Sequence, residues 1–176
     1  RKIVKVEVLD DDATLEQYST DASIFRVKPE IVVYPKDAED VKALVKFAAE
    51  QRKKKPDISL TARAGGTDMG GGSLNDSVII DFTKHFHRVK EIHTIEEIES
   101  RMGGVPVERP GGTVGGYAVV EPGTYYRDFE PEAARRGLLL PSYPASKWLC
   151  TLGGMVANNS GGEKTLAYGK TENYIS

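Results

Sequence analysis

The chain has 176 residues, enough for one or two domains with a buried core. Its formal net charge of −2 gives no electrostatic basis for nucleic-acid binding, so no nucleic-acid partner is expected. No apolar run approaches the ~18 residues of a membrane-spanning helix, and no signal peptide is visible. Cys150 is the single cysteine, which excludes an internal disulfide and suits a reducing compartment. We therefore expect a cytoplasmic globular protein without a transmembrane segment.

The first 29 residues predict a strand followed by a short helix. Residues 3–8 alternate between apolar and polar side chains, which is typical of a half-buried strand. Thr14 and Gln17 have the spacing of a capping box, which predicts a helix that starts at Thr14 and continues through Tyr18.

The clearest predicted helix follows a β-prone run at 30–34. Asp37 is suited to cap its N-terminus, and Pro56 marks its end. The expected buried face recurs at i, i+3, i+4 and i+7 and consists of Val41, Leu44, Val45 and Ala48.

A glycine-rich stretch, residues 62–73, lies between two further β-prone runs at 58–63 and 78–82. Five glycines fall within eight positions, so the backbone there can adopt positive φ and be approached closely by another group. Successive N–H groups of such a loop can converge on an anion, typically a phosphate. A flexible surface hairpin without a ligand is the alternative, and the loop by itself does not decide between the two.

The second half of the chain predicts two more strands and two helices. Strands are expected at 89–95 and 117–121, separated by an exposed excursion at 96–116 that forms a mobile loop or hairpin. A helix is expected at 124–136 with Gly137 as its C′ residue. Pro131 predicts a kink in it, or two short helices.

A second anion-competent element is the predicted helix start at 151–158. The first N–H groups of a helix carry partial positive charge and bind phosphate well. Gly153 and Gly154 would let a ligand lie against this turn, and further hydrogen bonds are available from Asn158, Ser160 and Thr67. A pyrophosphate could be clamped by the glycine loop and this helix start together.

Several standard sites are excluded by spacing. No glycine cluster has the i, i+2, i+5 pattern of a Rossmann dinucleotide fingerprint. Gly169–Thr171 imitates the end of a P-loop, but Lys164 stands where that motif requires glycine. His85 and His87 lack further ligands, so no metal is expected. Cys150 lies among apolar neighbours, which favours a packing role over a nucleophilic one.

An ordered series of short motifs runs through nearly the whole chain. The motifs are Tyr18–Ser23, Pro29–Pro35 with Asp40-Val41, Arg63–Thr67, Val120–Gly123, Leu140-Pro141, Pro144–Ser146, Thr151–Gly154, Ala157-Asn158, Gly161-Gly162 and Tyr168-Gly169. In this order they resemble the FAD-binding domain of the vanillyl-alcohol oxidase/p-cresol methylhydroxylase (PCMH) type. The resemblance is closest to FAD-linked oxidases of the D-lactate dehydrogenase and glycolate oxidase subunit branch.

The resemblance implies an α+β fold of two α/β subdomains with FAD between them. It divides the chain into an N-terminal strand and helix segment at 1–29, a first FAD-binding subdomain at 30–84 and a second at 85–176. In this family further FAD-domain strands and a substrate domain follow, so the chain is expected to be C-terminally incomplete. The substrate-binding residues and the general base usually lie in that later part, so no catalytic residue is named.

The resemblance also implies a set of cofactor-binding residues. In the first subdomain Gly65, Gly66, Thr67, Asp68 and Met69 would surround the pyrophosphate, and Arg63 is a further cofactor-binding residue. In the second they are Pro144, Ser146, Thr151, Gly153, Gly154 and Asn158. Some relatives carry a histidine, covalently bonded to the flavin, at the position of Thr67. We therefore expect non-covalent FAD.

The implied activity is that of an FAD-dependent oxidoreductase acting on a CH–OH group. In this family the flavin accepts a hydride equivalent from an alcohol, often a 2-hydroxy acid such as D-lactate or glycolate. The expected partners are a small-molecule substrate and an electron acceptor, and the chain by itself is expected to be inactive. The alternatives are a non-catalytic nucleotide- or phosphate-binding module and a structural domain with glycine hairpins.

Overall fold

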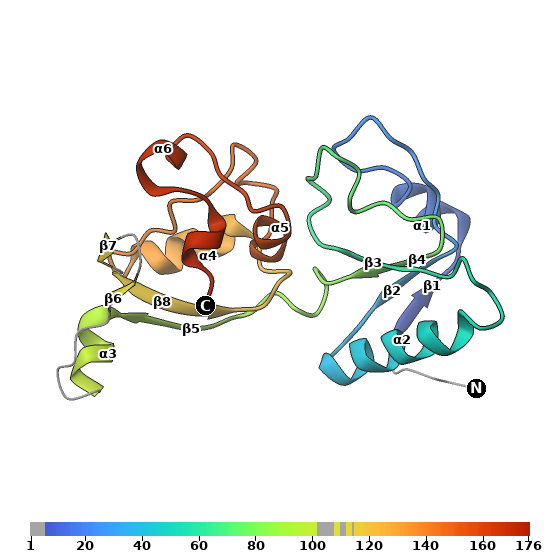
Figure 1. The fold of residues 1–176 in the computed structure, drawn as a ribbon, viewed down its shortest axis with the longest axis horizontal. Coiled ribbons are helices and arrows are strands. Elements are labelled where there is room, and N and C mark those ends of the chain that lie inside the picture. The colour runs from blue at the N-terminus through green and yellow to red at the C-terminus, as the bar shows by residue number, and fades with distance from the viewer. Residues whose placement is uncertain (1–5, 102–107, 110–111, 114) are drawn as a thin grey trace. The chain divides into compact units, whose positions relative to one another are not determined.

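The computed structural model describes residues 6–101, 108–109, 112–113 and 115–176. The chain divides into two compact units, residues 1–86 and 87–176, shown in Figure 1. The segment 1–29 lies within the first unit, because its strand pairs with the sheet of that unit.

The first unit is built on a four-stranded sheet in the order β1-β2-β4-β3. Its strands are β1 (Glu7–Leu9), β2 (Ile31–Tyr34), β3 (Leu60–Arg63) and β4 (Val78–Asp81). β4 runs parallel to both β2 and β3, whereas β1 is antiparallel to β2. The hairpin alternative for the glycine-rich stretch is therefore wrong: it crosses from the end of β3 to the start of a parallel neighbour.

Both faces of the two central strands are buried, which explains their continuous apolar sequence. On one face, Val33 and Ile80 pack with Leu44 of α2 (Ala38–Gln51). On the other, Val32 and Ile79 pack with Tyr18, which follows α1 (Asp12–Gln17). The fold thereby fixes the carboxyl ends of three parallel strands along one edge.

The start of α2 is confirmed, but part of its predicted face is wrong. The Asp37 carboxylate caps the helix by accepting the N–H of Asp40 at 2.9 Å. Val45 is 54% exposed. The buried residues of α2 are instead Asp40, Leu44 and Ala48, which lie four positions apart on one face. Asp40 can be buried because its carboxylate accepts a hydrogen bond from the Lys36 N–H at 3.1 Å.

The first helix, α1, begins earlier than predicted. Asp11 is its N-cap, and the Asp11 carboxylate accepts the N–H of Thr14 at 3.0 Å. Thr14 therefore lies inside the helix and is not its cap. Aspartate and threonine can both cap a helix, and Asp11 stands three residues before Thr14. The prediction chose Thr14 from the capping-box spacing and so placed the start of the helix too late.

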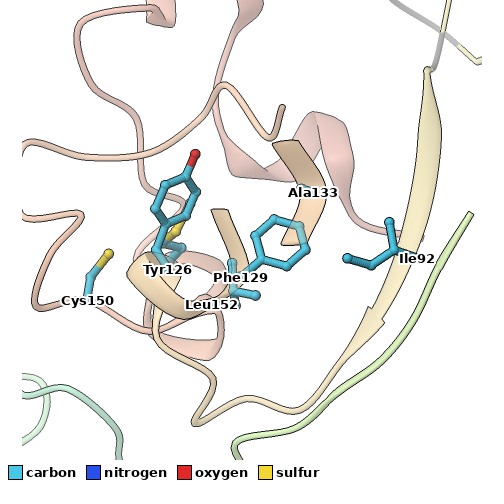
Figure 2. Packing of buried hydrophobic residues seen from close by; sticks show 7 residues of the cluster. Ile92, Tyr126, Phe129, Ala133, Cys150 and Leu152 are labelled. Carbon is cyan, nitrogen blue, oxygen red and sulfur yellow. The ribbon is translucent and has the colours of Figure 1, made fainter. Parts of the chain in front are cut away.

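The second unit packs helices against a two-stranded antiparallel sheet, β5 (Val89–Thr94) with β8 (Gly116–Val120). Figure 2 shows its core, to which these strands, α4 (Tyr126–Ala134) and α5 (Leu152–Ala157) contribute. The buried members are Ile92, Tyr126, Phe129, Ala133, Cys150, Leu152 and Met155. The aromatic side chains of α4 fill most of the space between the sheet and α5.

The local predictions in the second unit hold only in part. The excursion at 96–116 does contain a hairpin, because β6 (Glu108–Arg109) pairs antiparallel with β7 (Gly112–Thr113), but α3 (Ile95–Arg101) at its start was not expected. Residues 102–107, 110–111 and 114 lie outside the described part. α4 is one helix with Pro131 in its interior, not two helices. Helix α6 (Thr165–Tyr168) and the 3₁₀ helix η1 (Thr171–Tyr174) were not predicted.

Gly137 ends α4 as predicted. Its φ of +69° lies in the left-handed region, and its N–H donates to the carbonyl of Ala134 at 3.0 Å. The N–H of Leu138 reaches back to Ala133, also at 3.0 Å. These two bonds form the Schellman arrangement in which glycine is the favoured C′ residue.

Candidate functional site

The glycine loop starts at the carboxyl edge of the parallel strands. Arg63 is the last residue of β3 and is in register with Asp81, the last residue of β4. Residues 64–77 then connect the two strands. In open sheets with parallel strands, ligands commonly bind outside the carboxyl ends of the strands, where loops such as this one begin.

Two glycines give the loop a defined conformation. Gly66 and Gly71 have φ of +64° and +79°. A Cβ on Gly66 would lie 2.8 Å from Nη2 of Arg63, and one on Gly71 would lie 2.9 Å from a ring carbon of Phe25. The Gly66 carbonyl also accepts the N–H of Ala22 at 3.0 Å. The loop is therefore packed against the preceding 18–25 segment and needs glycine at both positions.

The loop already binds a carboxylate of its own. Oδ2 of Asp68 accepts the N–H of Gly72 at 2.6 Å, and a Cβ on Gly70 would lie 3.3 Å from the same oxygen. An acidic side chain repels a phosphate, so the predicted contribution of Asp68 to a pyrophosphate site comes from its main chain. Beside it, Met69 is 81% exposed. The Gly72 N–H therefore has an acceptor within the loop itself.

Arg63 points toward the 18–20 segment. Its Nη1 donates to the carbonyl of Tyr18 at 3.3 Å, and its Nη2 donates to the carbonyl of Thr20 at 2.8 Å. Its guanidinium carbon lies 5.0 Å from the centre of the Tyr18 ring, within the range of a cation–π contact. Two of its five N–H donors are thus used by the protein itself.

A buried polar network beneath Arg63 was missed from the sequence. Asp81 is 4% exposed, and its carboxylate accepts the Tyr18 hydroxyl at 2.8 Å. Thr83 supplies its N–H at 2.7 Å and its hydroxyl at 2.6 Å to the other carboxylate oxygen. The available signal was an aspartate at the end of a fully buried strand, because buried acids are rare unless several donors satisfy them.

The start of α5 differs from the anion site predicted there. Thr151 is its N-cap and is buried. The first four N–H groups of the helix all donate within the protein, at 3.1 Å or less. Leu152 donates to the Thr124 carbonyl and Gly153 to the Pro122 carbonyl. Gly154 donates to the Thr151 hydroxyl and Met155 to the Thr151 carbonyl. These N–H groups have protein partners, so the prediction that they are available to a phosphate is wrong.

The two glycines of α5 have different surroundings. A Cβ on Gly153 would lie 2.6 Å from both the carbonyl oxygen and Cβ of Pro122, so glycine there allows α5 to pack on the 121–124 turn. A Cβ on Gly154 would meet only the Thr151 hydroxyl, at 3.3 Å. Of the two, Gly154 is the one that a ligand can approach. Asn158, at the other end of α5, is exposed.

Pro144 and Ser146 lie in a turn that precedes α5. The Pro144 carbonyl accepts the N–H of Lys147 at 3.0 Å, and the Ser146 carbonyl accepts the N–H of Cys150 at 2.9 Å. A Cβ on Gly162 would lie 2.3 Å from the carbonyl oxygen of Tyr143. The structure therefore brings the turn that contains Pro144 and Ser146 against the glycine pair at 161–162. The predicted site residues of the two units form two separate sets, and their joint binding of one dinucleotide stays a prediction.

Other reactive side chains have structural surroundings. Burial raises the pKa of the Cys150 thiol to about 11, so it is not a thiolate nucleophile at neutral pH. The Thr171 hydroxyl of the P-loop lookalike donates to the carbonyl of Ser160 at 2.7 Å. Within the described ranges, no group of three or more His, Cys, Asp or Glu residues could hold a metal ion. Nor does that part of the chain contain a helix long and apolar enough to cross a membrane.

The sequence profile of one protein family, described as an FAD binding domain, matches residues 29–176. Among curated proteins, the chain is 29% identical to D-2-hydroxyglutarate dehydrogenase of Escherichia coli, over 89% of this chain and 13% of that protein. It is 28% identical to D-lactate dehydrogenase of Archaeoglobus fulgidus, over 82% of this chain and 27% of that protein. With the glycolate oxidase subunit GlcD of Escherichia coli the identity is 30%, over 94% and 29% respectively.

Solved structures agree on the fold. An alkyldihydroxyacetonephosphate synthase superimposes with a TM-score of 0.65 at 22% identity, over 94% of this chain and 30% of that one. The 6-hydroxy-D-nicotine oxidase of Arthrobacter nicotinovorans superimposes with a TM-score of 0.66 at 20% identity, over 97% and 32%. The chain thus spans less than a third of the length of these proteins and of the curated relatives named above.

Proposed function

We propose, from the premise that the chain belongs to the FAD binding domain family, that it holds FAD in a flavin-dependent oxidoreductase. The substrate proposed is a 2-hydroxy acid, because the relatives include enzymes named for D-2-hydroxyglutarate, D-lactate and glycolate. The chain covers only a part of such enzymes, so the catalytic activity is proposed for the longer protein that contains it.

The glycine loop is the observation that supports FAD binding most directly. Its backbone is fixed by Gly66 and Gly71 at the carboxyl edge of the sheet. Small side chains leave this main chain approachable, as a pyrophosphate requires. The residues present therefore fit the phosphates of a dinucleotide, with Gly65, Gly66 and Thr67 as the proposed contacts in the first unit.

The second unit is proposed to contact the same cofactor through four of the six residues that the resemblance implies. Since the N–H groups at the start of α5 are used internally, the surface of Gly154 and the turn at Pro144 and Ser146 are the proposed contacts. Asn158, which is exposed, is the fourth proposed contact.

Bound FAD supplies a two-electron acceptor for the hydride that leaves the hydroxyl-bearing carbon of the substrate. The chain contributes by holding the cofactor in place. Thr67 has a hydroxyl in place of an imidazole, so we propose that the flavin is held without a covalent bond at this position. A non-catalytic nucleotide-binding module remains the competing function.

Reduction of the flavin by substrate separates these two functions. The protein is purified at its full length, loaded with FAD, and mixed anaerobically with D-lactate, glycolate or D-2-hydroxyglutarate. We expect the flavin absorbance near 450 nm to bleach with at least one of these acids and to stay unchanged with the matching compound that lacks the hydroxyl group. FAD binding without bleaching by any of the three acids would support the non-catalytic module instead.

A further inference from the structure

Arg63 has the charge expected of a phosphate-binding residue, yet its contacts face the protein. Its two terminal nitrogens donate to main-chain carbonyls at Tyr18 and Thr20, and its plane lies over the Tyr18 ring. Two carbonyls and an aromatic face together hold a planar guanidinium in one orientation. A lysine, with one compact ammonium group, cannot make the same set of contacts.

The guanidinium of Arg63 also supports the loop. A Cβ on Gly66 would lie 2.8 Å from Nη2 of Arg63 and 3.2 Å from Cζ and Nε, so the Gly66 backbone packs directly on this group. The Gly66 carbonyl is fixed by the N–H of Ala22. The turn at 65–67 is thus held between Arg63 and the segment that Arg63 itself binds.

The orientation of the Tyr18 ring is fixed from the core. Its hydroxyl donates its one proton to the Asp81 carboxyl group. The Tyr34 hydroxyl, 2.8 Å away, must then donate to the Tyr18 oxygen. Tyr18 is buried, so its hydroxyl depends on these two protein partners for its hydrogen bonds. A continuous series of contacts therefore runs from Asp81 through Tyr18 and Arg63 to Gly66.

We propose that Arg63 acts on the bound dinucleotide as a positioning residue, fixing the 65–67 turn, and that Tyr18 and Asp81 hold Arg63 in place for this task. The proposal rests on the proposed function, in that the turn is taken to contact the cofactor phosphates. It assigns the effect of Arg63 to the shape of the turn and not to attraction between its charge and the pyrophosphate.

The test compares Arg63→Lys, Arg63→Gln and Tyr18→Phe, with Arg52→Gln at the exposed end of α2 as the matched control. FAD dissociation constants are measured by fluorescence titration at several salt concentrations. We expect Arg63→Lys and Arg63→Gln to weaken binding equally, by about tenfold, and Tyr18→Phe by about threefold. The dependence of log Kd on log salt should match that of the wild type, because no charge contact to the ligand is lost.

A second measurement needs no FAD. Amide hydrogen exchange at Ala22, whose N–H donates to the Gly66 carbonyl at 3.0 Å, should be several times faster in all three variants of the ligand-free protein and unchanged in Arg52→Gln. The proposal is overturned if Arg63→Lys binds FAD like the wild type, if Arg63→Gln reduces the salt dependence, or if exchange at Ala22 is unaffected. A wild type that binds no FAD would contradict the proposed function, and the exchange result would still test the positioning role.

Discussion

Two neighbouring glycines, Gly153 and Gly154, serve different purposes although they share one helical turn. The first has no room for a side chain, because the backbone and ring of Pro122 are in the way. The second meets only the hydroxyl of the helix cap. Only the second position is therefore suited to report on ligand binding.

Alanine at each position should separate packing from binding. Gly153→Ala should destabilise the protein by about 1–3 kcal/mol, because the new Cβ overlaps Pro122. Gly154→Ala should change the free energy of unfolding by less than about 1 kcal/mol, since alanine favours helix while the Thr151 hydroxyl is close. Urea unfolding measures both values.

Gly154→Ala should nevertheless weaken FAD binding by about tenfold if the cofactor lies against this turn. A variant with unchanged stability and unchanged FAD affinity would remove Gly154 from the site. The pair of variants provides its own control, because the two alanines differ by one position in the same helix.

The role of a residue could be predicted from the sequence where it depends on neighbouring residues. It could not be predicted where it depends on contacts with distant parts of the chain. The clustered glycines predicted a backbone that can reach positive φ, and Gly66 has a φ of +64°. The direction of Arg63 could not be predicted, because it depends on carbonyls more than 40 positions earlier in the chain. The bond between Tyr18 and Asp81 likewise joins residues 63 positions apart, and no periodic pattern connects them.

At the scale of elements, one buried carboxylate joins the ends of β5 and β8. Glu121, which is 5% exposed, follows β8 and accepts the N–H and guanidinium of Arg88, which precedes β5. The Lys90 ammonium lies 3.3 Å from the same carboxylate. These hydrogen bonds from Arg88 lower the pKa of Glu121 to about 2, from an ordinary value of 4.5.

The lowered pKa of Glu121 predicts that the folded protein becomes less stable as the pH falls. The folded state binds this proton more weakly than the unfolded state, so the stabilisation is complete above pH 4.5 and is lost as the pH falls toward 2. Because the Arg88 side chain is largely exposed and screened, the effect is about 1–3 kcal/mol. Glu121→Gln should lose this amount at pH 7 and show a flatter dependence of stability on pH below 5.

Urea unfolding followed by circular dichroism at pH 3, 5 and 7 measures this dependence. Glu172→Gln, an exposed carboxylate in the same unit, is the control and should behave like the wild type. If Glu121→Gln and the wild type lose stability in parallel as the pH falls, the ion pair does not stabilise the unit as described.

Most elements could be predicted because their signals lie in neighbouring residues. The cap at Asp37, the Schellman end at Gly137 and the apolar runs of the central strands are of this kind. Helix α3 was missed because its charged sequence looks like a solvent-exposed loop. Val45 was wrongly predicted to be buried because a buried Asp40 rotates the face of α2, and hydrophobic periodicity does not register a satisfied carboxylate.

At the scale of the whole molecule, an ordered series of weak motifs predicted the family. Each motif is short, but together they follow one another across both units, and the family profile matches residues 29–176. The parallel pairing of β3 with β4 could not be predicted, because a glycine loop between two strands usually suggests a hairpin. That pairing places the loop at the carboxyl edge of the sheet, where the proposed cofactor contact lies.

The central claim is that the glycine loop holds FAD without a covalent bond. FAD binding and acid release of the flavin, measured for the wild type and for Gly66→Val, test it most directly. The protein should bind one FAD per chain, and acid precipitation should leave all of the flavin in the supernatant. Gly66→Val should abolish binding while the far-ultraviolet circular dichroism stays like that of the wild type, because valine at φ +64° cannot keep the turn beside Arg63. Flavin retained in the acid pellet, or full binding by a folded Gly66→Val protein, would contradict the account.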